Sequence, residues 1–151
     1  MRTEARRRIA EDLAGADFAA FAARTGRIGG QSEQRAVGIV PDDVAAALGS
    51  DARVVRLSSY TAVKQRAHRR GQQFTATDYQ RVQPMLDEGL ILEESPGRLQ
   101  VFKQEAGQIW RAVVKVTEDR REIYLQSLHR STTTQMGRRA RKLKTLRREE
   151  Q

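Results

Sequence analysis

The chain has 151 residues, no cysteine, and 28 Lys and Arg against 19 Asp and Glu, which gives a net charge of +9. This length suits one domain with appendages and is too short for a large two-domain metabolic enzyme. The lack of cysteine excludes disulfides, thiolate metal sites and a cysteine nucleophile, and no apolar run approaches the roughly 20 residues of a membrane span.

The positive charge is concentrated near the C-terminal end. Residues 1–50 are neutral overall, residues 51–97 carry +1 and residues 98–151 carry +8. Such a local excess favours a polyanionic partner, most often nucleic acid, although a solvated basic tail is the simpler interpretation. Aromatic residues make up 5% of the chain, so stacked bases are not expected to be the main mode of binding.

The predicted elements begin with helix. Residues 3–24 are rich in alanine and carry apolar side chains at helical spacing, with Gly15 dividing the segment and Gly26 ending it. The composition of residues 27–35, RIGGQSEQR, is that of a linker. We therefore expect residues 1–30 to form a helical arm that packs on its own domain or docks on a partner.

The main domain, residues 37–131, is expected to start with short helices and a strand. Proline and acidic residues mark helix starts, glycine marks helix ends, and serine or threonine caps the first turn. The expected elements are a helix from Pro41 to Gly49, a strand over residues 53–57, a helix from Ser58 and Ser59 to about Arg70, and a helix that Thr77 and Gln80 begin and Pro84 kinks or restarts.

From Leu90 the apolar pattern changes to period two, which indicates strands. Short turn sequences separate four such segments, which predicts an antiparallel meander over residues 90–93, 98–103, 109–116 and 122–128. Residues 132–151 are expected to form a basic C-terminal helix or tail with a thin apolar stripe that includes Leu143 and Leu146. The order of elements predicts an α+β fold, with helices packed on a small meander of about four strands.

Several kinds of chemistry have no motif here. The chain lacks GxGxxG, GxxxxGK[ST] and GxSxG, and its two histidines, His68 and His129, are not in an HExxH arrangement. We therefore expect no nucleotide cofactor and no metal. What remains is proton transfer by histidine beside lysine and arginine, which is how RNA is cleaved without a metal. The candidates are Lys64, His68, Arg111, Lys115, Ser127, His129 and Arg130.

Alternation along the last two strands predicts which side chains share a face. Arg111, Val113 and Lys115 should lie opposite Trp110, which we expect in the core. On the final strand Glu122, Tyr124 and Gln126 should share one face, and Ile123, Leu125 and Ser127 the other. A polar face with Arg111, Lys115, Tyr124 and Gln126 would border a phosphate cleft, although exposed strand residues are the simpler interpretation. Tyr60 and Tyr79 are expected to be partly buried packing residues.

The segments VVRLSSYTAVKQRAHRR, TDYQRVQPMLDEG and IWRAVVKVTEDRREIYLQSLHR resemble a phage-borne branch of the barnase–EndoU–colicin–RelE-like nuclease group, found alone or with Mu-type phage head-morphogenesis proteins. The resemblance covers roughly residues 51–131 and implies metal-independent RNA cleavage or RNA binding. It places Lys64 and His68 in a helix motif, Lys115 in the third strand, and Ser127, His129 and Arg130 in the last. Arg69 and Arg70 follow the helix histidine where this branch often has proline and an acid, and no glutamate base has a clear equivalent.

Two hypotheses follow. The first is a phage-associated nucleic-acid-binding protein with a ribonuclease-like domain, catalytically active or not. Its catalytic residues would be His68, Lys115, Ser127 and His129, and its nucleic-acid-binding residues Lys64, Arg111, Arg130, Arg138, Arg139, Arg141, Lys142 and Lys144.

The alternative is a non-enzymatic virion protein of the phage head, portal or head–tail region, docked through its N-terminal arm and contacting packaged DNA through its basic tail. Either hypothesis involves nucleic acid and no membrane. Because the start of the chain lacks the apolar segment of a secretory signal, we expect the protein in the host cytoplasm during assembly, or in the virion.

Overall fold

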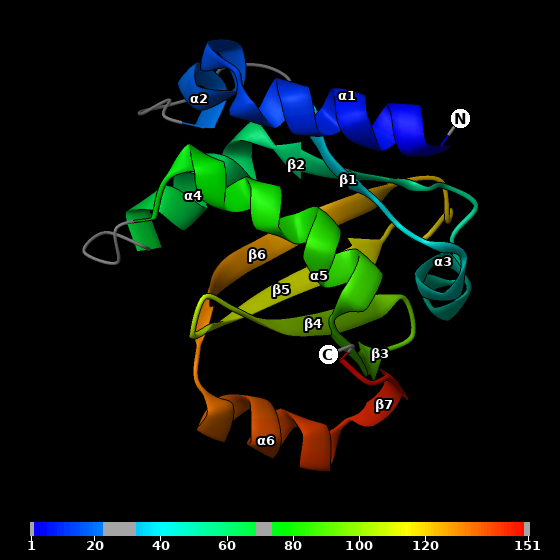
Figure 1. Cartoon of the computed structure of the whole chain (residues 1–151). Coiled ribbons are helices and arrows are strands. Elements are labelled where there is room, and N and C mark those ends of the chain that lie inside the picture. Colours follow the sequence, from blue (N-terminus) through cyan, green and yellow to red (C-terminus); the bar gives the residue numbers. More distant parts are fainter. Residues whose placement is uncertain (1, 23–32, 69–73, 150–151) are drawn as a thin grey trace.

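A computed structural model describes residues 2–22, 33–68 and 74–149, and in them the chain forms an α+β fold with a seven-stranded mixed sheet (Figure 1). The predicted α+β class is confirmed, whereas the predicted four strands are an undercount. The expected meander forms the middle of the sheet, in the order β6-β5-β4-β3. The strands are β1 (Gln34–Ile39), β2 (Val54–Ser58), β3 (Leu90–Ser95), β4 (Arg98–Glu105), β5 (Gln108–Val116), β6 (Ile123–Ser131) and β7 (Lys144–Arg147).

The three additional strands extend both edges of the meander. β2 pairs with β6 in parallel, β1 pairs with β2 in antiparallel orientation, and β7 pairs with the far side of β3. The meander itself depends on two tight turns. Gly97 takes a φ of 80° after Pro96, and Ala106 and Gly107 both have positive φ, 50° and 77°, as two-residue hairpin turns require.

Helices cover one face of the sheet (Figure 1). Phe18, Phe21, Val44, Met85 and other helical side chains form one continuous core with sheet residues that include Trp110, which is 2% exposed as expected. The helices on this side are α1 (Arg2–Ala14), α2 (Ala16–Ala22), α3 (Asp42–Leu48), α4 (Ser59–His68), the 3-10 helix η1 (Ala76–Arg81) and α5 (Val82–Glu88).

The N-terminal helices pack on this chain. The predicted division at Gly15 is confirmed, and Leu13, Phe18 and Phe21 on either side of it are buried in the main core. Arg6 of α1 donates to Asp87 of α5 at 2.7 Å. The apolar side chains of the arm therefore pack in the core of this chain. Gly26 and residues 27–32 lie outside the described residues.

The helix boundaries follow the predicted caps in part. The Ser58 hydroxyl accepts a hydrogen bond from the Thr61 amide, and Gly49 ends α3 in the left-handed conformation. The predicted capping box at Thr77 is wrong, because the reciprocal bonds join Thr75 and Asp78 two residues earlier. Arg70, the predicted end of α4, lies outside the described residues.

The C-terminal segment, predicted as a basic helix or tail over residues 132–151, forms a shorter helix followed by a strand. Helix α6 spans Thr133–Lys142 with Leu143 as its C-cap, and the chain continues as strand β7. Met136, Ala140 and Leu143 pack against a second apolar cluster, formed by Leu92, Phe102 and Ile109 on the sheet face away from the other helices. Leu146 contacts the main core instead. The helical spacing of Leu143 and Leu146 is therefore misleading, because pairing with β3 overrides it.

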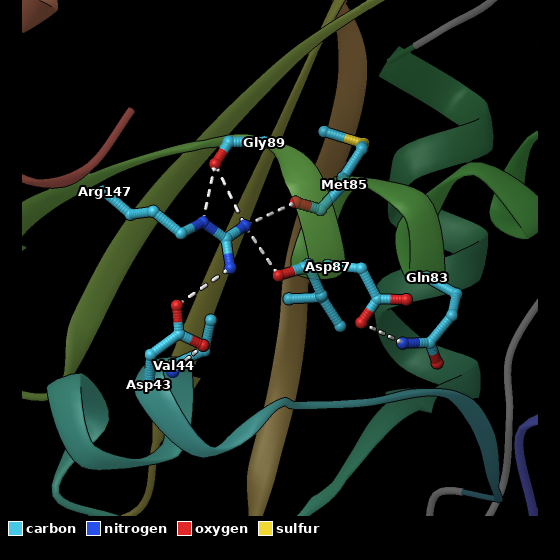
Figure 2. Close-up of polar contacts among 8 residues, drawn as sticks. Asp43, Val44, Gln83, Met85, Asp87, Gly89 and Arg147 are labelled. Carbon is cyan, nitrogen blue, oxygen red and sulfur yellow. Dashed lines mark hydrogen bonds and ion pairs between the residues drawn. The ribbon is translucent and has the colours of Figure 1, made fainter. Parts of the chain in front are cut away.

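Arg147 connects β7 to the rest of the domain through hydrogen bonds (Figure 2). Its Nη2 donates to the carbonyl oxygens of Leu86 at 2.7 Å and Gly89 at 3.0 Å, and its Nη1 donates to Asp43 at 3.1 Å. The guanidinium thus satisfies carbonyl groups at the C-terminal end of α5, where a positive charge is favourable. It joins three elements that are far apart in the chain.

We expect Arg147→Ala to lower the free energy of unfolding by about 2 kcal/mol, because these carbonyl oxygens lose a charged donor. Urea denaturation followed by circular dichroism would measure the change. The exposed neighbour Arg148 gives a matched control, since Arg148→Ala removes the same charge and should change stability by less than about 0.5 kcal/mol. Equal denaturation midpoints for the two variants would contradict this role of Arg147.

Candidate nucleic-acid interface

A β-bulge in β6 decides which side chains reach the sheet face that lies away from helices α1 to α5. Val113 of β5 pairs with Ser127, but Val114 pairs with Leu125, so Gln126 is an extra residue between them. The prediction that Ser127 shares a face with Ile123 and Leu125 is therefore wrong. Ser127 joins Tyr124 on the opposite face, because residues directly paired in antiparallel strands point to the same side.

The face so formed, here called the open face, carries mostly polar and basic side chains. Arg111 lies between Phe102 and His129, and Lys115 lies between Arg98 and Tyr124. Helix α6 covers the end of this face that Ile109 and Phe102 occupy. The strand register thus puts four predicted site residues on the open face, Arg111, Lys115, Ser127 and His129, with Arg111 directly opposite His129.

Three arginines are the main electrostatic feature of the open face. Arg111 of β5 is half-buried, its guanidinium carbon lies 5.8 Å from the centroid of the Phe102 ring, and its Nε has no hydrogen-bond partner in the described part of the chain. Burial, followed by the nearby charge of Arg139 and the smaller effect of Arg98, lowers the pKa of Arg111, and Glu94 opposes this shift. The folded protein therefore holds the charge of Arg111 at an electrostatic cost.

Glu94 and Gln100 form the polar surroundings of Arg98. Glu94 makes an ion pair with Arg98 and accepts a hydrogen bond from Gln100 Nε2 at 2.6 Å. Gln100 is fully buried, and its Oε1 has no partner among the described residues. Gln100 Oε1 and Arg111 Nε are thus two buried polar atoms of this face without a hydrogen-bond partner in the described part of the chain.

A cleft of about 520 Å³ opens between α4 and the bulge of β6. Gln65 forms its closed side, since its side chain accepts from the Leu128 amide at 2.8 Å and donates to the Tyr79 hydroxyl at 3.1 Å. We call this the α4–β6 cleft; its lining residues are Tyr60, Thr61, Lys64, Gln65, Arg98, Gln126 and Ser127. An adjoining hollow of about 380 Å³ shares Thr61 and Gln126 and includes Lys115 and Tyr124.

Tyr124 closes the side of this hollow with a hydrogen-bonded hydroxyl. The hydroxyl donates to Glu122 at 2.8 Å and accepts from Gln34 at 2.6 Å. Burial raises the pKa of Tyr124, and the hydrogen bond to Glu122 adds to that shift. The phenol is therefore protonated at neutral pH and serves as a neutral wall of the hollow.

Helix α6 presents a second basic surface beside the open face. Gln135, Arg138, Arg139 and Lys142 recur at helical spacing and line a hollow of about 170 Å³. Of these, Arg139 acts electrostatically on Arg111. The predicted binding residues of α6 are thus split, because Arg141 lies exposed outside this hollow.

Two further predicted site residues, Arg130 and Lys144, lie apart from the open face. His68 is the last residue of α4, and its side chain lies outside the described part of the structure. Arg130 is the cross-strand partner of Trp110, and its guanidinium carbon lies 5.6 Å from the centroid of the Trp110 ring, so Arg130 lies on the helix-covered side. Lys144 lies in β7 opposite Glu93. Tyr60, predicted to be partly buried, is 68% exposed, whereas Tyr79 is buried with a bonded hydroxyl as expected.

Sequence reasoning missed Arg98, Gln100 and Tyr60. Alternation along residues 98–103 gives the signal for the first two, since Leu99 and Val101 face the core and leave Arg98 and Gln100 on the other side. No comparable signal marks Tyr60, because helix spacing alone does not show what packs over each face.

Comparisons with protein-family models, with curated proteins and with solved structures give no match to this chain. Among the helices that the structure describes, none has the length and apolar character needed to cross a bilayer. Within the same residues, no three or more His, Asp or Glu side chains gather as metal ligands would.

Replacing Arg111 should show the electrostatic cost of the open face. Arg111→Met removes a half-buried charge beside Arg139 and Arg98 but keeps an unbranched side chain over the Phe102 ring. We expect the free energy of unfolding to rise by about 0.5 kcal/mol at low salt and the gain to shrink at high salt. Urea denaturation at both salt concentrations tests this, with the exposed Arg121→Met as control. A salt-independent loss of stability would contradict it.

Proposed function

We propose that the protein binds nucleic acid through the open face, with the phosphodiester backbone as its main ligand. The observation that carries the proposal is the strand register, which puts Lys115 directly opposite Arg98 on the face that also holds Arg111, so that like charges repel each other across neighbouring strands. A phosphate would relieve that repulsion and accept hydrogen bonds from guanidinium groups. Lys64 in the α4–β6 cleft and Lys115 beside it extend the basic surface along one side of the sheet.

Phosphate contacts predict a characteristic dependence on salt. Arg111→Gln should weaken binding of a short fluorescent RNA roughly tenfold and reduce the slope of log affinity against log salt by about one. Fluorescence anisotropy at several salt concentrations measures both quantities. Arg8→Gln is the matched control, because Arg8 is exposed on α1, the helix-covered side, and its loss changes the net charge equally. Equal effects of the two variants would refute binding by the open face.

A second candidate function is metal-independent RNA cleavage on the same face. The β6 bulge favours it, because it turns Ser127 and His129 to the open face, where His129 is paired directly with Arg111. His129 would take the proton from the 2′-hydroxyl as a base, or give a proton to the leaving 5′-oxygen as an acid, and the cations would stabilise the negative charge on the non-bridging phosphate oxygens. The link to a phage and the alternative role in a virion stay predictions from the sequence.

Cleavage is tested with a fluorogenic RNA in EDTA. If His129 transfers the proton, His129→Ala should reduce the rate by at least about 100-fold, because general acid–base catalysis contributes that much. Anisotropy with a non-cleavable deoxy analogue serves as the control and should show little change in affinity. A wild-type rate in EDTA no higher than that of the variant would reject the ribonuclease and leave the binding proposal standing.

A further inference from the structure

We infer that the α4–β6 cleft receives one unpaired base of a single strand, stacked on Tyr60, an inference that rests on the proposed function. Within the described residues, Tyr60 is the large hydrophobic side chain left exposed, at 68%. Among the other aromatic side chains, Trp110, Tyr79, Phe21, Phe102 and Phe18 are buried, and Phe74 and Tyr124 are partly buried. Tyr60 lines the α4–β6 cleft, so its exposed ring borders a concave surface, and a tyrosine offers both an apolar ring and a polar hydroxyl to a ligand there.

The residues around Tyr60 fit a nucleotide. Lys64 is four residues further along α4 and therefore lies on the same helix face, within reach of the phosphate next to a stacked base. Arg98, which also pairs with Glu94, lines the cleft from the sheet, so basic side chains are present on two sides. The cleft of about 520 Å³ is within the usual size range of small-ligand sites, roughly 300–1,000 Å³.

The floor of the cleft can hydrogen-bond the edge of a base. Gln126 is the exposed extra residue of the bulge, and its amide offers both a donor and an acceptor. The Ser127 hydroxyl lies next to it in the same lining. Behind them, the amide nitrogen of Gln65 donates to the Tyr79 hydroxyl and its amide oxygen accepts from the Leu128 amide. Gln65 therefore forms the wall of the cleft, and the contacts to a base are left to Gln126 and Ser127.

This geometry selects single strands over duplexes. In a duplex each base is already stacked and paired, so it cannot lie on Tyr60 unless it is extruded, which costs free energy. A single strand can turn one base into the cleft while its backbone follows the arginines of the open face. The phosphate contacts serve both ligands, whereas Tyr60 serves the single strand alone.

The test compares a short mixed-sequence single-stranded RNA with its duplex at one salt concentration, using the full chain. Wild type should bind the single strand more tightly. Tyr60→Leu, which keeps apolar bulk but removes the flat ring, should weaken single-strand binding about tenfold and leave duplex binding unchanged. Tyr60→Phe keeps the ring and should bind like wild type. Because Tyr60 is exposed, circular dichroism and urea midpoints of all three proteins should agree.

Other outcomes overturn the inference in distinguishable ways. Equal losses on single strand and duplex, or no loss for Tyr60→Leu, would reject stacking at Tyr60. If Arg111→Gln still weakened binding in that case, the proposed function would stand without the base site. If wild type bound neither ligand with a dependence on salt, the proposed function and this inference would both fail.

Discussion

The bulge at Gln126 is the constraint on which the core and the candidate site both depend. Leu125 and Leu128 are three residues apart, yet both are buried in the main core. Strict alternation would put one of them on the other face, so an extra residue between them is required. The same residue shifts Ser127 and His129 to the open face. The same bulge therefore determines both the packing of the core and the placement of the candidate catalytic side chains.

The bulge also lies where β6 loses its neighbour. β2 pairs with β6 at Ile123 and Tyr124, and beyond them the buried Gln65 of α4 accepts from the Leu128 amide in place of a strand. A buried amide group must find a partner, so this glutamine holds α4 against the edge of β6. The α4–β6 cleft opens at this departure from regular pairing, and it owes its position to Gln65 as much as to its exposed lining.

How far the sequence predicts this fold depends on whether the deciding contacts are local. The meander was predictable because Pro96-Gly97 and Ala106-Gly107 mark its turns and its strands alternate regularly. The division at Gly15 and the cap at Ser58 are local in the same sense. The pairing of β2 with β6, the bulge and the conversion of residues 144–147 to strand depend on partners distant in the chain. The open face was accordingly half predictable: Arg111 and Lys115 follow from alternation, whereas Ser127 was assigned to the wrong side.

The basic residues of the C-terminal third have several different roles, which the net charge of that segment does not show. Arg147 is a structural cation that satisfies carbonyl oxygens, and Arg130 lies on the Trp110 ring on the helix-covered side. Arg139 adds to the arginines of the open face, while Arg141 and Lys144 remain exposed. A free basic tail would repel itself and extend, but here the segment is folded back by β7 and by the apolar contacts of α6. Its folding against the sheet therefore places Arg139 beside Arg111, where like charges gather at a cost that an anionic ligand would offset.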